Sequence, residues 1–242
     1  MRLVKLDAID STNDYLKALC KNEAVGNFTI VTAAYQQNGK GQMESSWCSE
    51  SDKNVIMSVL IKDLLPDLSQ LFHLNVAVSV AVIDALSAYR IPLLSIKWPN
   101  DIMSGNKKIG GILIENTIKS NGHSNSIIGL GLNVNQMNFT DLPKATSLSL
   151  VTGITFDIEK MVVEIGDSIK KFASPPKYAT AESWSAYTVR LFKKGIPMPF
   201  SDRFDNQFMG IILGVNAGGK LQLLLDDETV AAFDIKEIQM LY

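Results

Sequence analysis

The stretch that decides the fold covers residues 97–115 and reads KWPNDIMSGNKKIGGILIE. Hydropathy alternates along residues 94–98, which predicts a strand that Pro99 ends, because proline cannot donate to a strand ladder. A polar turn at 104–106 and a β-rich run over 109–115 then predict that the chain returns antiparallel to this strand, as a hairpin. The two glycines of the returning strand would let a flat ligand approach its backbone closely.

The residues before this hairpin predict short strands, one capped helix and one long helix. The segment DSTN at 10–13 supplies capping side chains for a helix with one apolar face. Residues 71–89 are apolar on nearly all sides, which is typical of a helix buried beneath a sheet. The β-rich runs cover 2–7, 28–33 and 55–61. The polar segment between the last two runs, residues 35–53, has the length of a functional loop.

The residues after the hairpin divide into a mixed part and a β-rich part. One more strand is expected over 126–134, followed by helices over 161–172 and 181–191. Beyond them, three short β-rich runs are separated by turn residues, which predicts a small all-β barrel. We therefore expect an α+β chain. A mixed, mainly antiparallel sheet packed with helices would cover 1–192, and a small β domain would cover 193–242.

The composition argues against several classes of protein. The chain has 242 residues and a net charge of -2 at pH 7, so it lacks the excess of lysine and arginine typical of nucleic-acid binding. Cys20, Cys48, His73 and His123 are too scattered for a structural zinc site, and no secretion signal is recognisable at the start. Polar residues interrupt the longest apolar run, so no membrane span is predicted. We expect a cytoplasmic protein that binds neither DNA nor membranes.

Three segments carry side chains suited to binding a ligand. The segment GKG at 39–41 places a cation between two glycines, where the backbone could fold around phosphate, although an ordinary surface turn has the same composition. Asn100 and Asp101 stand at the turn after the first hairpin strand, where a carboxylate could hold a hydroxyl or a metal. A purely structural polar turn is an equal alternative. Lys107 and Lys108 enter the returning strand, either to bind an anion or to protect a sheet edge.

Together, five blocks resemble the sequence pattern of the biotin protein ligases. They are the Ser-Thr-Asn start of the first helix, QQNGKG in a loop that ends at Trp47, KWPND, KIGGILIE and GLGLNVN. The blocks follow the family's order from residue 11 to residue 135, and the β-rich tail resembles the family's small SH3-like domain. The resemblance implies a class II synthetase-like catalytic domain that uses biotin and ATP with Mg²⁺. It also implies biotinyl-5′-AMP as intermediate and a lysine of a biotin carboxyl carrier protein as acceptor.

The resemblance also assigns roles to individual residues. The catalytic residues would be Lys108, Asp101 and Lys97, with magnesium near Asp101. The residues that contact biotin would be Ser11, Thr12, Asn13, Gln36, Gly39, Lys40, Lys108, Gly110, Gly111 and Leu113. The residues that contact ATP would be Lys40, Gly41, Gln42, Trp47, Asn100 and Asn133.

The chain departs from the family pattern in its loop and at its start. Many relatives carry Gly-Arg-Gly-Arg-x-Gly-Arg, whereas this chain has Gln42 and Glu44 in place of an arginine and a glycine. Some relatives have an amino-terminal helix-turn-helix domain, for which the distance from Met1 to Ser11 leaves no room, so a ligase without a DNA-binding domain is expected. The alternatives are a lipoate or octanoate transferase of related fold and a catalytically weak binder of biotinyl-adenylate. An exposed sheet edge or the β-rich tail could serve a homodimer or the acceptor protein.

Overall fold

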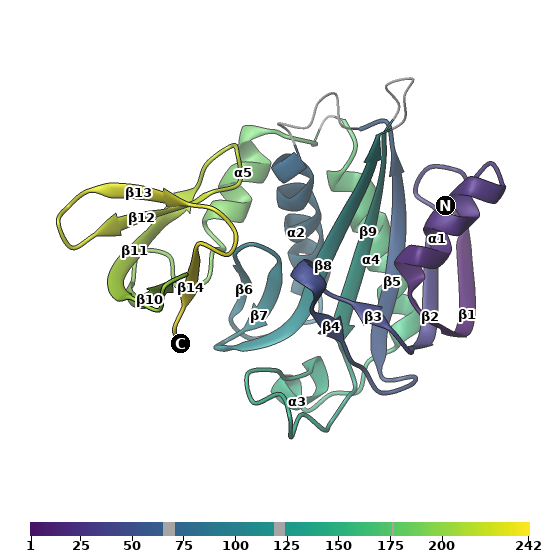
Figure 1. Ribbon diagram of the computed structural model, residues 1–242. Coiled ribbons are helices and arrows are strands. Elements are labelled where there is room, and N and C mark those ends of the chain that lie inside the picture. The colour runs from purple at the N-terminus through teal and green to yellow at the C-terminus, as the bar shows by residue number, and fades with distance from the viewer. Residues whose placement is uncertain (65–70, 119–123, 176) are drawn as a thin grey trace.

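The computed structural model describes residues 1–64, 71–118, 124–175 and 177–242. His123, named above among the scattered cysteines and histidines, lies outside them. The described residues form a seven-stranded sheet with helices on both faces and a second sheet of five strands (Figure 1). The predicted α+β class is confirmed.

The large sheet is mixed and mainly antiparallel, as predicted. Its strand order is β1-β2-β5-β9-β8-β7-β6. Only β1 and β2 run parallel among its described neighbouring pairs. The strands are β1 (Leu3–Ile9), β2 (Ile30–Gln36), β5 (Asn54–Lys62), β6 (Leu94–Lys97), β7 (Asp101–Ser104), β8 (Lys107–Ile118) and β9 (Ser124–Asn133).

Helices cover both faces of this sheet. One face carries α1 (Thr12–Asn22), and the other carries α2 (Leu71–Ser87) and α4 (Ile158–Phe172), with α5 (Ala181–Thr188) packed against α2 (Figure 1). Because side chains alternate along a strand, each sheet face has its own apolar cluster. The cluster beneath α1 consists of Leu16, Val25, Val31, Leu60 and Ile127. The larger cluster includes the buried residues of α2 and α4.

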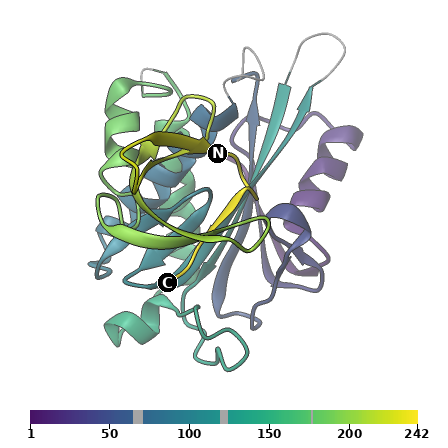
Figure 2. The same cartoon turned by 60° about the vertical axis from the view of Figure 1, so that its left-hand side comes forward.

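The second sheet lies beside α5 and the β6–β7 edge of the large sheet (Figure 1 and Figure 2). Its strand order is β13-β12-β11-β10-β14. The Trp98 indole donates a hydrogen bond of 2.9 Å to the Gly219 carbonyl and so ties the two sheets together. A small β domain is therefore present, whereas its boundary at residue 193 stays a prediction. The strands are β10 (Pro197–Asp202), β11 (Gln207–Val215), β12 (Leu221–Leu225), β13 (Val230–Phe233) and β14 (Ile238–Met240).

The predicted hairpin over 94–115 was wrong, because a further strand lies between its two strands, which therefore run in the same direction and do not pair with each other. The turn after β6 contains Pro99, and β7 begins directly at Asp101, so β6, β7 and β8 form a three-stranded meander. Ile102 and Met103 are fully buried, but two apolar residues are too few to give a recognisable strand pattern. The other elements that the sequence did not indicate are β10 and β14 of the second sheet and the short elements β3 (Gly39–Lys40), the 3-10 turn η1 (Gln42–Glu44), β4 (Ser46–Trp47) and α3 (Leu148–Thr152).

Candidate active site

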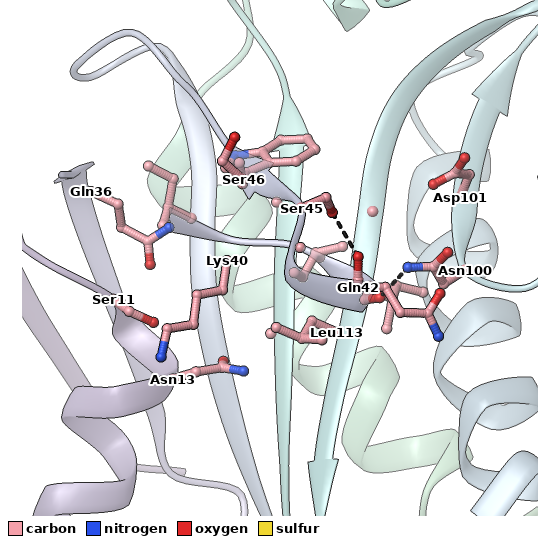
Figure 3. Close-up of a pocket in the computed structure, with 18 of the residues that line it drawn as sticks. Ser11, Asn13, Gln36, Lys40, Gln42, Ser45, Ser46, Asn100, Asp101 and Leu113 are labelled. Atoms are coloured by element: carbon pink, nitrogen blue, oxygen red, sulfur yellow. Dashed lines mark hydrogen bonds between the residues drawn. The ribbon is translucent and has the colours of Figure 1, made fainter. Parts of the chain in front are cut away.

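A cavity of about 270 Å³ lies on the face of the large sheet that carries α1 (Figure 3). Strands β5, β8 and β9 form its floor, and the start of α1 and the end of β2 form one side. The β6–β7 turn forms the opposite side, and the loop over 40–47 lies over it. The cavity therefore joins segments that extend from Ser11 to Gly131 in the sequence, including all five blocks named above.

The end of the cavity beside α1 is lined mainly by uncharged groups, which a hydrogen-bonded chain connects to Ser58 and Glu115 behind the lining. The backbone N–H and hydroxyl of Thr12 lie 2.7 and 3.0 Å from Gln36 Oε1 and donate to it. Ser58 Oγ lies 2.7 Å from Thr12 Oγ1 and donates to Asn13 Oδ1 at 2.6 Å. Asn13 Nδ2 donates to Glu115 at 2.7 Å. Each of these polar groups except Glu115 is buried, and such a chain fixes the orientation of every member.

The helix start that presents these groups is set by its own sequence. Ser11 adopts an extended backbone, and its hydroxyl accepts a bond of 3.4 Å from the backbone N–H of Asp14, as expected for a helix cap. The predicted cap is therefore confirmed. Since the cap residue and the first helical residues point into the cavity, the local signal that starts the helix also places Thr12 and Asn13.

Glycines in the floor let two side chains lie flat on the sheet. A Cβ at Gly129 would stand 2.6 Å from Asn13 Oδ1, and a Cβ at Gly131 would stand 2.3 Å from the Trp47 ring. Neither distance is possible for a real side chain. Gly111 lies opposite Gly131 in the pairing of β8 and β9, so the bare patch extends across two strands. The space above Gly129 and Gly131 is thus filled by Asn13 and Trp47, which become part of the cavity lining.

The other end of the cavity holds two cations that share one carboxylate. Lys108 Nζ lies 2.6 Å from Asp101 Oδ1, and Lys97 Nζ lies 3.5 Å from Asp101 Oδ2. Lys97 and Asp101 face each other in the pairing of β6 with β7, which fixes their separation. Lys108 Nζ also stands 5.8 Å from the centre of the Trp47 ring. One carboxylate cannot neutralise two ammonium groups, so this end is suited to an anion.

The loop over the cavity is folded on itself, and its cation points to an unexpected place. The Gly41 N–H donates to the Ser45 carbonyl at 2.6 Å, and the Ser45 hydroxyl donates to the Gln42 carbonyl at 2.7 Å. Lys40 Nζ pairs with Asp14 of α1 at 2.6 Å and extends toward the α1 end, away from Asp101 (Figure 3).

This pairing shifts the pKa of both partners. Burial acts to raise the pKa of Asp14, but the hydrogen bond and charge of Lys40, with a contribution from Lys17, hold that pKa below its ordinary value. The hydrogen bond from Lys40 to Asp14 raises the pKa of Lys40. Lys40 is therefore a poorer candidate for the phosphate end of a ligand than the sequence alone indicates.

Most of the residues assigned by resemblance line this cavity, and three do not. Gly110 is buried on the opposite face of β8, since alternation along the strand turns it away from Gly111. Gly39 lies beneath the loop, where a Cβ would stand 2.3 Å from the Trp47 carbonyl, so it permits the pairing of β3 with β4. Asn133 is buried and donates to the Thr146 carbonyl at 3.0 Å.

Sequence reasoning missed residues that hold the lining groups in place. Ser58 is fully buried and joins Thr12 to Asn13, and Glu115 accepts hydrogen bonds from Asn13 and Lys17. A lone serine within an apolar strand was an available signal for Ser58. Glu115 was quoted as the last residue of a block, but nothing in the sequence connected it to Asn13.

The donor set does not form a metal site by itself. Within the described ranges, no group of three or more His, Cys, Asp or Glu residues is placed to hold a metal ion. Asp101 is the one carboxylate among the described residues that line the cavity.

In the part of the chain that the structure describes, no helix combines the length and hydropathy needed to cross a membrane.

Comparison with known proteins identifies the family. The model of the Biotin/lipoate A/B protein ligase family matches residues 6–133. The chain is 36% identical over 159 residues to the bifunctional ligase/repressor BirA of Bacillus spizizenii, covering 64% of this chain and 48% of that protein. It is 29% identical over 145 residues to the biotin--[acetyl-CoA-carboxylase] ligase of Mycobacterium tuberculosis, covering 57% of this chain and 51% of that protein. The chain thus spans about half the length of these curated relatives.

A solved structure shows the same fold over the whole chain. The biotin protein ligase from Aquifex aeolicus in complex with biotin and ATP superposes with a TM-score of 0.79 at 24% identity, covering 99% of this chain and 98% of that one. The family match includes every residue that lines the cavity. Since it covers more than half of the sequence, the chain belongs to the biotin/lipoate A/B protein ligase family.

Proposed function

We propose that this protein is a biotin protein ligase. It would activate biotin with ATP to biotinyl-5′-AMP and then transfer biotin to a lysine of a biotin carboxyl carrier protein. One observation carries the proposal: a single cavity has uncharged hydrogen-bonding groups at one end and a Lys–Asp–Lys cluster at the other. Biotin has a neutral polar ring system at one end and a carboxylate at the other, so its two ends match the two ends of the cavity.

The α1 end would bind the ring system of biotin. Its ureido group has N–H donors and a carbonyl acceptor, which are complementary to the amide and hydroxyl groups of Thr12, Asn13 and Gln36. The absence of side chains at Gly129 and Gly131 lets Asn13 and Trp47 lie against the sheet, and the flat bicyclic ring would bind between them. Because the hydrogen-bonded chain through Ser58 already orients these groups, binding requires little further ordering.

The charged end would carry out the first reaction. A carboxylate oxygen of biotin attacks the α-phosphorus of ATP, the bond to the β-phosphate oxygen breaks, and pyrophosphate leaves with the bonding electrons. The biotin carboxylate is itself the nucleophile, so the protein does not need to supply one. Lys108 would oppose the negative charge that builds on the phosphate, and Asp101 would hold the Lys108 ammonium in place.

Magnesium fits this end as an ion carried by the nucleotide. Mg²⁺ usually keeps several waters and binds through one or two carboxylates together with substrate phosphates. Asp101 is the carboxylate available among the described lining residues, so it would be the protein ligand of such an ion. The ion would supply positive charge to the phosphate oxygens. To contact the ion, Asp101 would give up part of its ion pair with Lys97. That pair is longer, at 3.5 Å, than its pair with Lys108, at 2.6 Å.

The second reaction needs an acceptor lysine but no additional protein group. The neutral ε-amine attacks the carbonyl of the mixed anhydride, an amide bond forms, and AMP leaves with the bonding electrons as the amine loses a proton. Cys48 is exposed and is absent from the cavity lining, so it has no role in this scheme.

The proposal is tested by incubating the protein with ATP, an isolated biotin carboxyl carrier domain and one of three acids: biotin, lipoate or octanoate. We expect a mass increase of the carrier domain and release of AMP with biotin alone. Transfer of lipoate or octanoate in preference to biotin would assign the chain to the other branch of its family. Formation of biotinyl-adenylate without transfer would reduce the function to binding and activation.

A further inference from the structure

A further cation, Lys144, lies outside the cavity lining and shares an aromatic neighbour with Lys97, which belongs to that lining. Lys144 Nζ stands 4.6 Å from the centre of the Tyr242 ring, and Lys97 Nζ stands 5.4 Å from the same ring. Two ammonium groups are therefore gathered around one aromatic side chain. Lys144 is exposed and forms no ion pair among the residues that the structure describes.

Backbone contacts hold this group in a fixed position. The Lys108 N–H donates to the Lys144 carbonyl at 2.8 Å, and the Thr146 N–H donates to the Lys108 carbonyl at 2.9 Å. The segment that carries Lys144 is thus bound to the start of β8. Tyr242 packs against Phe192 with ring centres 5.2 Å apart. In Figure 1 the point marked C lies below β14, to the left of β6 and β7.

The electrostatics of this group favour a polyanion. Burial raises the pKa of Tyr242, and the charge of Asp101 adds to that effect, so the phenol stays neutral and offers its ring to both lysines. An aromatic ring attracts a cation only weakly at an exposed site. Asp101 is already shared between Lys97 and Lys108, which leaves Lys144 without a countercharge among the described residues.

We propose that Lys144, with Lys97 and the ring of Tyr242, forms a subsite for the leaving pyrophosphate of the nucleotide. This subsite rests on the proposed function. When the bond between the α- and β-phosphates breaks, the bonding electrons and their negative charge go to the pyrophosphate. Lys144 adds a cation to Lys97 and opposes the negative charge of the pyrophosphate after the pyrophosphate has moved out of reach of Lys108. Tyr242 is a positioning residue, because it orients the two ammonium groups without contacting the reacting atoms.

The test measures binding of sodium pyrophosphate to the biotin-loaded protein by isothermal titration calorimetry. One unit charge about 4 Å from another in water is worth about a fivefold change in affinity. We therefore expect Lys144→Ala to weaken pyrophosphate binding by about fivefold or more. Tyr242→Leu should weaken it by less, because it removes no charge but only the ring that orients the two ammonium groups. Lys107→Ala removes an exposed lysine at the same edge, and Tyr242→Phe keeps the ring, so both controls should bind pyrophosphate like the wild type.

Three results would overturn the subsite. They are a wild type that does not bind pyrophosphate, a Lys144→Ala variant that binds it with wild-type affinity, and a Lys107→Ala variant that loses as much affinity as Lys144→Ala. Biotin affinity and melting temperature, measured on each variant, separate a local loss from unfolding. Biotinyl-adenylate formation is scored independently. A wild type that binds pyrophosphate through Lys144 but makes no adenylate would refute the proposed function and leave the subsite intact.

Discussion

Replacing Ser58 with alanine tests whether the buried hydrogen-bonded chain supports both the fold and the biotin end of the cavity. Ser58 is fully buried in the middle of β5 and does not line the cavity. Its hydroxyl lies 2.7 Å from Thr12 Oγ1 and 2.6 Å from Asn13 Oδ1. Ser58→Ala removes these contacts and leaves two buried polar groups with one partner fewer.

The expected loss follows from those contacts. Leaving a buried polar group without its partner costs about 1 to 3 kcal/mol of the free energy of unfolding. For a chain of 150 to 250 residues, each kcal/mol corresponds to a fall of roughly 2 to 4 °C in melting temperature. Asn13 and Thr12 also lose orientation, so we expect biotin affinity to fall about fivefold or more, the equivalent of about 1 kcal/mol.

A matched control is available in the same core. Ser79 is also fully buried, in α2, but its hydroxyl has no hydrogen-bond partner among the described residues. Ser79→Ala should leave the melting temperature unchanged or raise it, because it removes an unpaired buried polar group and alanine favours a helix. Calorimetric melting and biotin titration of both variants provide the comparison. Equal melting temperatures for Ser58→Ala and Ser79→Ala would refute the stabilising role of the chain.

Four further predictions concern the charged end and the loop. Lys108→Ala should slow adenylate formation by about 10² to 10³ in a pyrophosphate-release assay with little change in melting temperature, and a variant that melts early but turns over normally would contradict this. Biotin with ATP should protect residues 36–53 from limited proteolysis, and unchanged cleavage would count against loop closure. Gln42→Arg should slow release of biotinyl-adenylate roughly tenfold, since a charged donor binds phosphate more strongly than an amide, and equal release rates would disprove it. Gly131→Ala should displace Trp47 and weaken ATP binding more than biotin binding in titrations, whereas unaltered ATP affinity would show that the ring can move freely.

Much of the fold could be predicted from local patterns, and the exceptions have physical causes. The capped helix at Ser11 and the long apolar helix α2 are confirmed, because caps and periodicity act within one element. β7 was missed because its pairing with β6 and β8 depends on tertiary contacts that two buried apolar residues do not reveal. β10 was missed because Pro197 and Pro199 oppose a strand in sequence terms.

The candidate site was predictable where its residues belong to contiguous motifs. Asp101 and Lys108, quoted from neighbouring blocks, form an ion pair in the structure. The partner of Lys40 could not be predicted, since Asp14 lies on a helix that the loop reaches only in the folded chain. Contacts of this kind depend on sheet order, which periodicity does not determine. Whether the lining residues have the roles that the resemblance gives them stays a prediction.

A crystal structure of the protein soaked with biotin and ATP tests the central claim most directly, because it shows which end of the cavity receives which chemical group. The account predicts the ureido ring within hydrogen-bonding distance of Thr12, Asn13 and Gln36, and the phosphate beside Lys108. Biotin in the reverse orientation, a phosphate at the Lys40–Asp14 pair, or ligand bound outside this cavity would contradict it.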